Sequence, residues 1–170
     1  ETDWAGWSDM CRARYTVSGS GRDSEFVSRV PRSVVKEWES RMGPSWGALH
    51  HYCFGLADIA RSKREGDPAK RAFHLRSAVS EFLFMLNRVP IEHPMYAETL
   101  TQLGLTNLEQ KDREGALQYF DKAIATHPEI PGAYQGKSLL YRDLKRYSEA
   151  RDVLLAGDKA TEGKSPDIQY

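Results

Sequence analysis

The sequence predicts an all-α protein in which antiparallel helix pairs stack as an α-solenoid. Small residues recur 34 positions apart, so that Gly104 matches Ser138 and Ala116 matches Ala150. Leucines and other apolar residues around them follow the three- and four-residue spacing of a helix face. A fixed period of this length, with small residues at close-contact positions, is typical of stacked helix–turn–helix units.

The clearest repeat spans residues 97–130. Its first helix is predicted from the leucines at positions 100, 103, 105 and 108, and its second from Leu117, Phe120, Ala123 and Ile124. The polar residues 110–113 form the turn between them. His127-Pro128 ends the second helix, and Pro131-Gly132 opens the next pair.

These residues resemble a tetratricopeptide repeat. The first match rests on Leu103-Gly104, Ala116, Phe120, Ala123 and Pro128, with Asn107 standing where an aromatic residue is more typical. Residues 131–164 resemble a second repeat that departs from the pattern at Lys137, Gly157 and Glu162; its matching residues are Ala133-Tyr134, Tyr141, Tyr147, Ala150 and Leu154. The resemblance implies a right-handed superhelix with a concave groove.

Residues 46–94 are predicted to form a divergent hairpin of the same kind. Ser45 opens a helix over 46–63, and Asp67 with Pro68 starts a longer second helix that reaches about Val89. The residues expected to face inward from this second helix are Phe73, Ala78, Phe82, Leu83, Leu86 and Val89.

The two ends of the chain differ from the repeats. Residues 1–45 are predicted to be a capping segment with one short helix over 31–42 and a loop over 15–21. Trp4, Trp7 and Tyr15 are expected to cover the first repeat, and an aromatic ligand clamp is the alternative. Residues 165–170 fall where a further repeat would begin, so we expect a repeat or cap that is truncated there.

Composition argues against several classes of function. Acidic and basic residues balance at 24 each, which disfavours nucleic-acid binding. No apolar run approaches the roughly 18 residues of a membrane span. No phosphate-binding glycine loop or catalytic triad motif is present, so we expect no enzyme activity, no catalytic residues and no cofactor.

The two cysteines leave three readings open. Cys11 and Cys53 could form a disulfide that pins the capping segment to the first long helix, or remain buried thiols. A metal site with His50 is disfavoured because too few ligands are present. We expect no bound metal.

Six basic residues lie near the turn at 64–68, at positions 61, 63, 64, 70, 71 and 76. A solvated turn is the favoured interpretation, and a contact with anionic lipid or an acidic partner is the alternative.

The resemblance places a partner-binding groove on the first helix of each repeat. Leu105 and Leu139 are expected to be its apolar anchors, because each occupies a position that usually points into the groove. The full predicted set is Glu98, Thr101, Gln102, Leu105, Glu109, Gln135, Leu139, Arg142 and Asp143. The Lys and Asn clamp that some chaperone-binding members use is absent.

Two classes of function follow. The first is an interaction scaffold or assembly factor, bacterial and exported to the periplasm rather than cytoplasmic, which binds a partner peptide or helix in the groove. The alternative is an accessory domain of a larger enzyme or of a membrane-associated secretion or transport machine. Homo-oligomers are compatible with either class.

Overall fold

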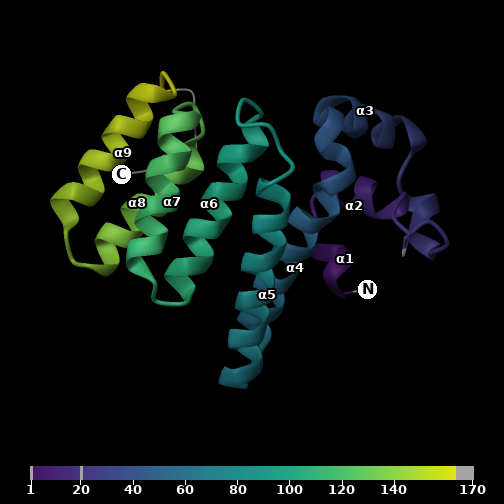
Figure 1. Cartoon of the computed structure of the whole chain (residues 1–170), viewed down its shortest axis with the longest axis horizontal. Coiled ribbons are helices and arrows are strands. Elements are labelled where there is room, and N and C mark those ends of the chain that lie inside the picture. Colours follow the sequence, from purple (N-terminus) through teal and green to yellow (C-terminus); the bar gives the residue numbers. More distant parts are fainter. Residues whose placement is uncertain (1, 20, 164–170) are drawn as a thin grey trace. The chain divides into compact units, whose positions relative to one another are not determined.

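A computed structural model describes residues 2–19 and 21–163. Within these residues the chain is all-α, and no strand is present. The helices separate into two compact units, Glu1–Val89 and Pro90–Tyr170, each with its own internal packing (Figure 1). The predicted fold class, an all-α helical repeat protein, is therefore confirmed for the described residues. The predicted start of a further repeat at 165–170 lies outside them.

The second unit contains the two clearest repeats. Its helices are α6 (Pro94–Glu109), α7 (Arg113–Thr126), α8 (Pro131–Asp143) and α9 (Tyr147–Ala160). Turns of three residues join α6 to α7 and α8 to α9, and Figure 1 shows each pair running side by side in opposite directions. The middle residues of the two turns, Lys111 and Lys145, both have left-handed backbone conformations and lie one repeat apart.

Phe120 holds these helices together. Its ring is fully buried and packs with Ala116 and Leu140 in one core cluster. A β-carbon placed on Gly104 in α6 would lie 2.5 Å from the ring, and one on Gly136 in α8 would lie 2.3 Å from it. Only hydrogen at these two positions leaves room for the ring, which explains why both are glycine.

The first unit contains a longer hairpin with the same contact. Helices α4 (Leu49–Arg64) and α5 (Pro68–Leu86) pack along each other. A β-carbon on Gly55 would lie 2.5 Å from the buried ring of Phe82, as on Gly104 against Phe120. The chain between Gly55 and Phe82 contains about three more helical turns than the chain between Gly104 and Phe120. These additional turns are divided between α4 and α5.

Two details of this hairpin differ from the sequence prediction. The segment Gly43–Ala48 is a 3-10 turn, so the α-helix begins at Leu49 and not at Trp46. Ser45 is buried and does not cap the helix.

Phe73 is 60% exposed and Leu83 is also exposed, because the inward stripe of α5 runs instead through Leu75, Ala78, Phe82 and Met85. Asp67 does cap α5, accepting hydrogen bonds from the backbone N–H groups of Ala69 and Lys70.

The amino-terminal segment is more helical than predicted. Besides α3 (Arg32–Met42), it contains α1 (Thr2–Gly6), α2 (Asp9–Thr16) and a 3-10 turn over Glu25–Arg29. The prediction of a single helix and of a loop from Tyr15 was wrong, since Tyr15 and Thr16 belong to α2. Ser8 begins α2 by accepting a hydrogen bond from the backbone N–H of Cys11, and tertiary links to α4 then hold this short helix in place.

Candidate functional site

The predicted groove residues lie on α6 and α8 of the second unit. Glu98, Gln102, Leu105 and Glu109 follow one face of α6, and Gln135, Leu139 and Arg142 follow one face of α8. Helices α6 and α8 contact each other directly. The first helices of the two repeats are therefore neighbours, as a continuous binding surface requires.

The two leucines expected to anchor a partner differ in their surroundings. Leu139 is 51% exposed on α8. Leu105, its counterpart one repeat earlier, is partly buried and packs against the core cluster that contains Phe120 and Leu140. Of these two leucines, therefore, only Leu139 presents a large apolar surface to solvent.

Two other predicted groove residues are occupied by contacts within the repeats. Thr101 was expected to be exposed, and this was wrong: it is 3% exposed, because its methyl group faces α8 near Gly132. Its hydroxyl donates a hydrogen bond to the backbone carbonyl of Ala97. Asp143 accepts hydrogen bonds from Arg113 at 2.6 and 2.9 Å, and this contact lowers the pKa of its carboxyl group.

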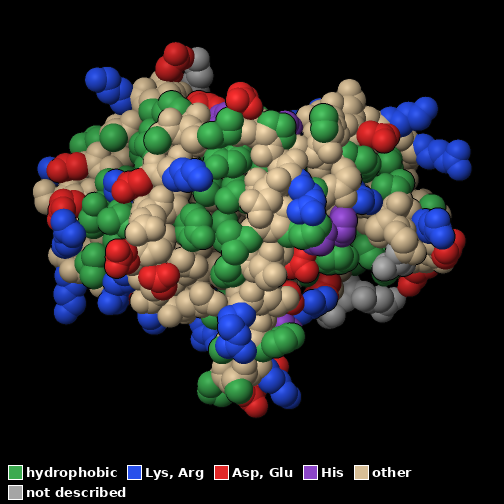
Figure 2. Space-filling model, in the orientation of Figure 1, with side chains coloured by type: hydrophobic (Ala, Val, Ile, Leu, Met, Phe, Trp, Pro, Cys, Tyr) green, Lys and Arg blue, Asp and Glu red, His purple; other side chains and the backbone are tan. Residues whose placement is uncertain are grey.

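The remaining members form a mixed polar surface. Gln102 and Gln135 are partly exposed, and Glu109 and Arg142 are exposed. Glu98 is half-buried, and burial raises the pKa of its carboxyl group because the charged form loses hydration. The predicted faces of α6 and α8 therefore carry hydrogen-bonding groups and charges of both signs together with the exposed Leu139. Figure 2 shows basic and acidic side chains interspersed over the visible face.

His127 fixes the turn that follows α7, a role that the sequence did not indicate. Its Nδ1 lies 2.8 Å from Glu129 Oε1, and its Nε2 lies 2.8 Å from the backbone carbonyl oxygen of Ile91. Both neighbours accept hydrogen bonds, so only the protonated ring can donate to both. Burial works to lower the His127 pKa, but the two hydrogen bonds and the negative charge of Glu129 outweigh it and raise the pKa above its ordinary value.

We therefore expect the second unit to lose stability as the pH rises. A raised pKa in the folded state means that the stabilisation is complete below the unfolded pKa of about 6.5 and is lost as the pH passes the folded value. Urea unfolding followed by far-UV circular dichroism should show this loss between pH 6 and 8.5. His127→Gln is the control: the difference in unfolding free energy between it and the original chain should shrink over that range. A constant difference would contradict the prediction.

In the first unit, the disulfide Cys11–Cys53 joins α2 to α4, with the Cα atoms 5.5 Å apart. His50 takes no part in a cysteine site. Its ring contacts the Gly47 carbonyl and the Arg14 guanidinium, and burial together with the positive charge nearby lowers its pKa. Across residues 2–19 and 21–163, no group of three or more His, Cys, Asp or Glu side chains is placed to hold a metal ion.

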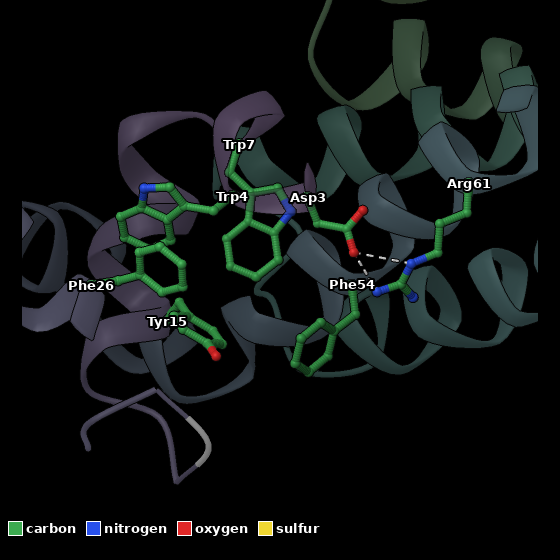
Figure 3. A pocket seen from close by; sticks show the side chains of 7 residues that line it. All are labelled: Asp3, Trp4, Trp7, Tyr15, Phe26, Phe54 and Arg61. Atoms are coloured by element: carbon green, nitrogen blue, oxygen red, sulfur yellow. Dashed lines mark hydrogen bonds and ion pairs between the residues drawn. The ribbon is translucent and has the colours of Figure 1, made fainter. Parts of the chain in front are cut away.

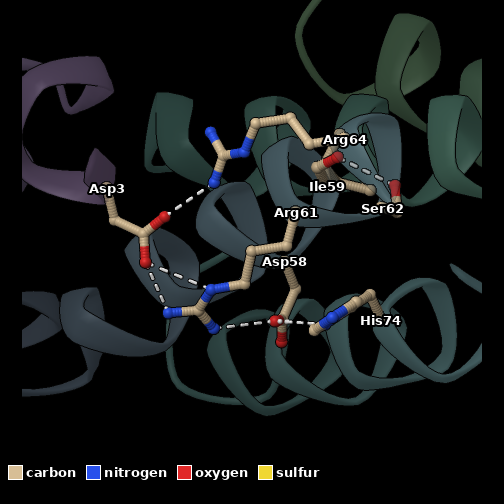
Figure 4. A network of polar contacts seen from close by, with 7 residues as sticks. All are labelled: Asp3, Asp58, Ile59, Arg61, Ser62, Arg64 and His74. Carbon is tan, nitrogen blue, oxygen red and sulfur yellow. Dashed lines mark hydrogen bonds and ion pairs between the residues drawn. The ribbon is translucent and has the colours of Figure 1, made fainter. Parts of the chain in front are cut away.

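Two of the six basic residues near the 64–68 turn are engaged by Asp3 of α1. Arg61 donates to Asp3 at 2.6 and 3.1 Å, and Arg64 donates at 3.0 Å (Figure 4). Arg61 also donates to the buried Asp58, whose carboxylate meets His74. Burial tends to raise the Asp3 pKa, but the two arginines outweigh it and lower the pKa. These arginines thus tether α1 to α4, which the sequence did not predict.

The aromatic residues of the amino-terminal segment gather beside this tether. Trp4, Trp7 and Tyr15 lie with Phe26 and Phe54 around an open cavity of about 180 Å³, with Asp3 and Arg61 at its edge (Figure 3). Trp4 stacks on Phe26, with ring centroids 4.5 Å apart. Phe54 could have been anticipated, because it follows Cys53 and the disulfide brings it next to α2. No pattern in the sequence pointed to Phe26.

These observations define the class of the protein. It is an all-α helical repeat protein in which glycine-to-phenylalanine contacts join successive helices. In the described residues no helix is both long and apolar enough to cross a membrane.

Comparison with known proteins identifies the family. The family model described as a tetratricopeptide repeat matches residues 97–129. The chain is also 39% identical over 61 residues to an uncharacterised protein of Methanocaldococcus jannaschii, a match that covers 36% of this chain and 71% of that protein. The chain belongs to the tetratricopeptide repeat family. Tetratricopeptide repeats are generally modules for protein–protein interaction and not catalysts.

Proposed function

We propose that this protein is an interaction scaffold that binds an extended peptide or a helix of a partner protein across α6 and α8. The exposed Leu139 carries the proposal. It is an exposed apolar side chain on the same face of α8 as the polar Gln135 and Arg142, and apolar anchors flanked by polar groups are typical of peptide-binding sites.

The surrounding residues supply direction to the contact. Gln102 and Gln135 can pair with backbone groups of an extended segment, and Arg142 can pair with an acidic side chain. Leu105 and Thr101 are better assigned to packing within the repeats, because Leu105 packs against the core cluster and Thr101 faces α8 near Gly132. The proposed contact residues are therefore Glu98, Gln102, Glu109, Gln135, Leu139 and Arg142.

The Cys11–Cys53 disulfide supports an oxidising compartment as the place of action. Disulfides persist in exported proteins and are rare in a reducing cytosol. We infer an exported protein on this ground.

A matched pair of substitutions tests the groove. Leu139→Asp should lower the unfolding free energy by no more than about 1.5 kcal/mol, because half of the side chain is already exposed, while weakening partner binding by at least about tenfold. Leu105→Asp should cost several kcal/mol, on the order of 3, because it places a charge against the core. Urea unfolding gives the stabilities, and affinity capture from the native source followed by titration gives the binding.

The two variants separate the groove from simple packing. A large loss of stability for Leu139→Asp would show that another helix covers this position, and would remove Leu139 as a contact residue. Unchanged binding by a stable Leu139→Asp protein would contradict the proposal.

A further inference from the structure

The aromatic cavity of the first unit has the features of a built binding site. Five aromatic side chains line it, and all five are partly exposed: Trp4, Trp7, Tyr15, Phe26 and Phe54. An aromatic ring that is partly exposed retains apolar surface that an occupant could cover. Apolar cavities of about 150 Å³ in other proteins hold a single small ring such as benzene, and this cavity is of similar volume.

The walls of the cavity come from segments that are far apart in the sequence and are fastened together. Tyr15 is on α2 and Phe54 is on α4, and the disulfide between Cys11 and Cys53 joins these two helices. Asp3 on α1 is held to Arg61 on α4 by two hydrogen bonds. A covalent link and an ionic link thus fix the same cavity, and preorganised walls reduce the cost of binding.

The charges at the edge select against charged occupants. The Asp3 carboxylate is neutralised by Arg61 and Arg64, so it offers little attraction to a cation, and Arg61 would repel one. An anion would meet the same carboxylate and the negatively polarised faces of the rings. Those faces would attract a cation, but Arg12 already lies over the Trp4 ring and Arg29 over the Phe26 ring. An uncharged group suits this cavity best.

The shape of the lining favours a flat occupant. Trp7 meets Tyr15 nearly edge to face, with an interplanar angle of 73° and a centroid distance of 5.2 Å. It meets Phe54 at 61° and 6.4 Å. Rings held at such angles offer both faces and edges to a further ring.

Trp7 also has room to adjust. A second, smaller recess of about 60 Å³ lies along Trp7, between α1 and α4, and the buried indole N–H of Trp7 has no hydrogen-bond acceptor. A small shift of this ring would let the indole donate to a polar atom on an occupant.

We propose that the cavity binds an uncharged aromatic ring, presented either by a free small molecule or by an aromatic side chain of a peptide. This site lies in the first unit and is independent of the groove on α6 and α8, so its test does not depend on the proposed function.

Saturation-transfer NMR and calorimetry on the whole chain test the proposal with indole as the probe. Indole should bind saturably with a dissociation constant on the order of 1 mM or lower. Benzoate and tetramethylammonium should bind at least about tenfold more weakly, because the edge of the cavity opposes either charge. A blocked tripeptide with tryptophan at its centre, compared with free indole, distinguishes a side chain from a small molecule as the preferred source.

Matched variants locate the binding. Phe54→Ala removes one wall and should weaken indole binding by at least about fivefold, whereas Phe73→Ala, which alters an exposed phenylalanine outside the cavity, should leave it unchanged. If Phe54→Ala does not fold, Phe54→Trp is used instead. Its larger side chain fills the cavity and should also weaken indole binding. Reduction of Cys11–Cys53 should also weaken binding, because it releases one wall from the other.

Several outcomes would overturn the proposal. The first is that indole does not bind saturably. The second is that a folded Phe54→Ala or Phe54→Trp protein binds indole as tightly as the original chain. The third is that tetramethylammonium binds more tightly than indole. The last result would assign the cavity to cations.

Discussion

Phe120→Ala is expected to lower the free energy of unfolding of the second unit by about 3–5 kcal/mol, which is a large part of the stability of a small domain. The ring is fully buried and joins α6, α7 and α8 at one point. At Gly104 and Gly136 the ring lies against helix backbone, which cannot move into a cavity as a flexible side chain can. The cavity left by Phe120→Ala should therefore stay open. Urea unfolding followed by far-UV circular dichroism measures the change.

Phe73→Ala provides the control of the same chemistry. Phe73 is largely exposed, so its loss should change stability by no more than about 0.5 kcal/mol. A loss of less than about 1 kcal/mol for Phe120→Ala would contradict the assignment of this ring as the centre of the repeat packing.

A second substitution tests the contact between ring and glycine. Gly136→Ala alone should destabilise, since its β-carbon would lie 2.3 Å from the Phe120 ring. In a Phe120→Ala background the same methyl group enters vacated space. The cost of the double substitution should therefore be smaller than the sum of the single costs.

Loss of the Cys11–Cys53 disulfide is expected to destabilise the first unit by about 3–4 kcal/mol. The bond closes a loop of 42 residues, and a constraint of this length removes substantial entropy from the unfolded chain. It also holds α2, a helix of only eight residues, which would be marginal by itself. The second unit contains no cysteine and should be unaffected.

The distribution of tryptophan makes this measurable unit by unit. All four tryptophans lie in the first unit, at positions 4, 7, 38 and 46. Their fluorescence should report unfolding at lower urea after reduction, or in the Cys11→Ser, Cys53→Ser double variant. Adding reductant to that variant should change nothing further. If reduction left the fluorescence transition in place, the disulfide would have no part in the stability of this unit.

The sequence by itself determined the repeat architecture of the second unit. Its information is local and periodic: helix length, turn position and the recurrence of glycine and alanine depend on neighbours a few residues away or one period away. The start of α5 is also local, since Asp67 caps it and Pro68 begins it. These features need no knowledge of contacts between distant segments.

Only the tertiary structure decided which predicted residues remain available for binding. Leu105 and Leu139 occupy equivalent positions in the sequence, yet the first packs against the core cluster that contains Phe120 and the second is exposed. Thr101 is buried because its methyl group faces α8 near Gly132. Equivalent positions in a repeat receive different neighbours, and the sequence of one repeat does not state what packs against it.

The amino-terminal segment depended on tertiary structure most strongly. Helices α1 and α2 have five and eight residues, too short to be stable by local interactions. They are held by the disulfide and by the contacts of Asp3 with Arg61 and Arg64, which join residues 42 to 61 positions apart. The aromatic cavity arises from these long-range links, so no local pattern could assemble it.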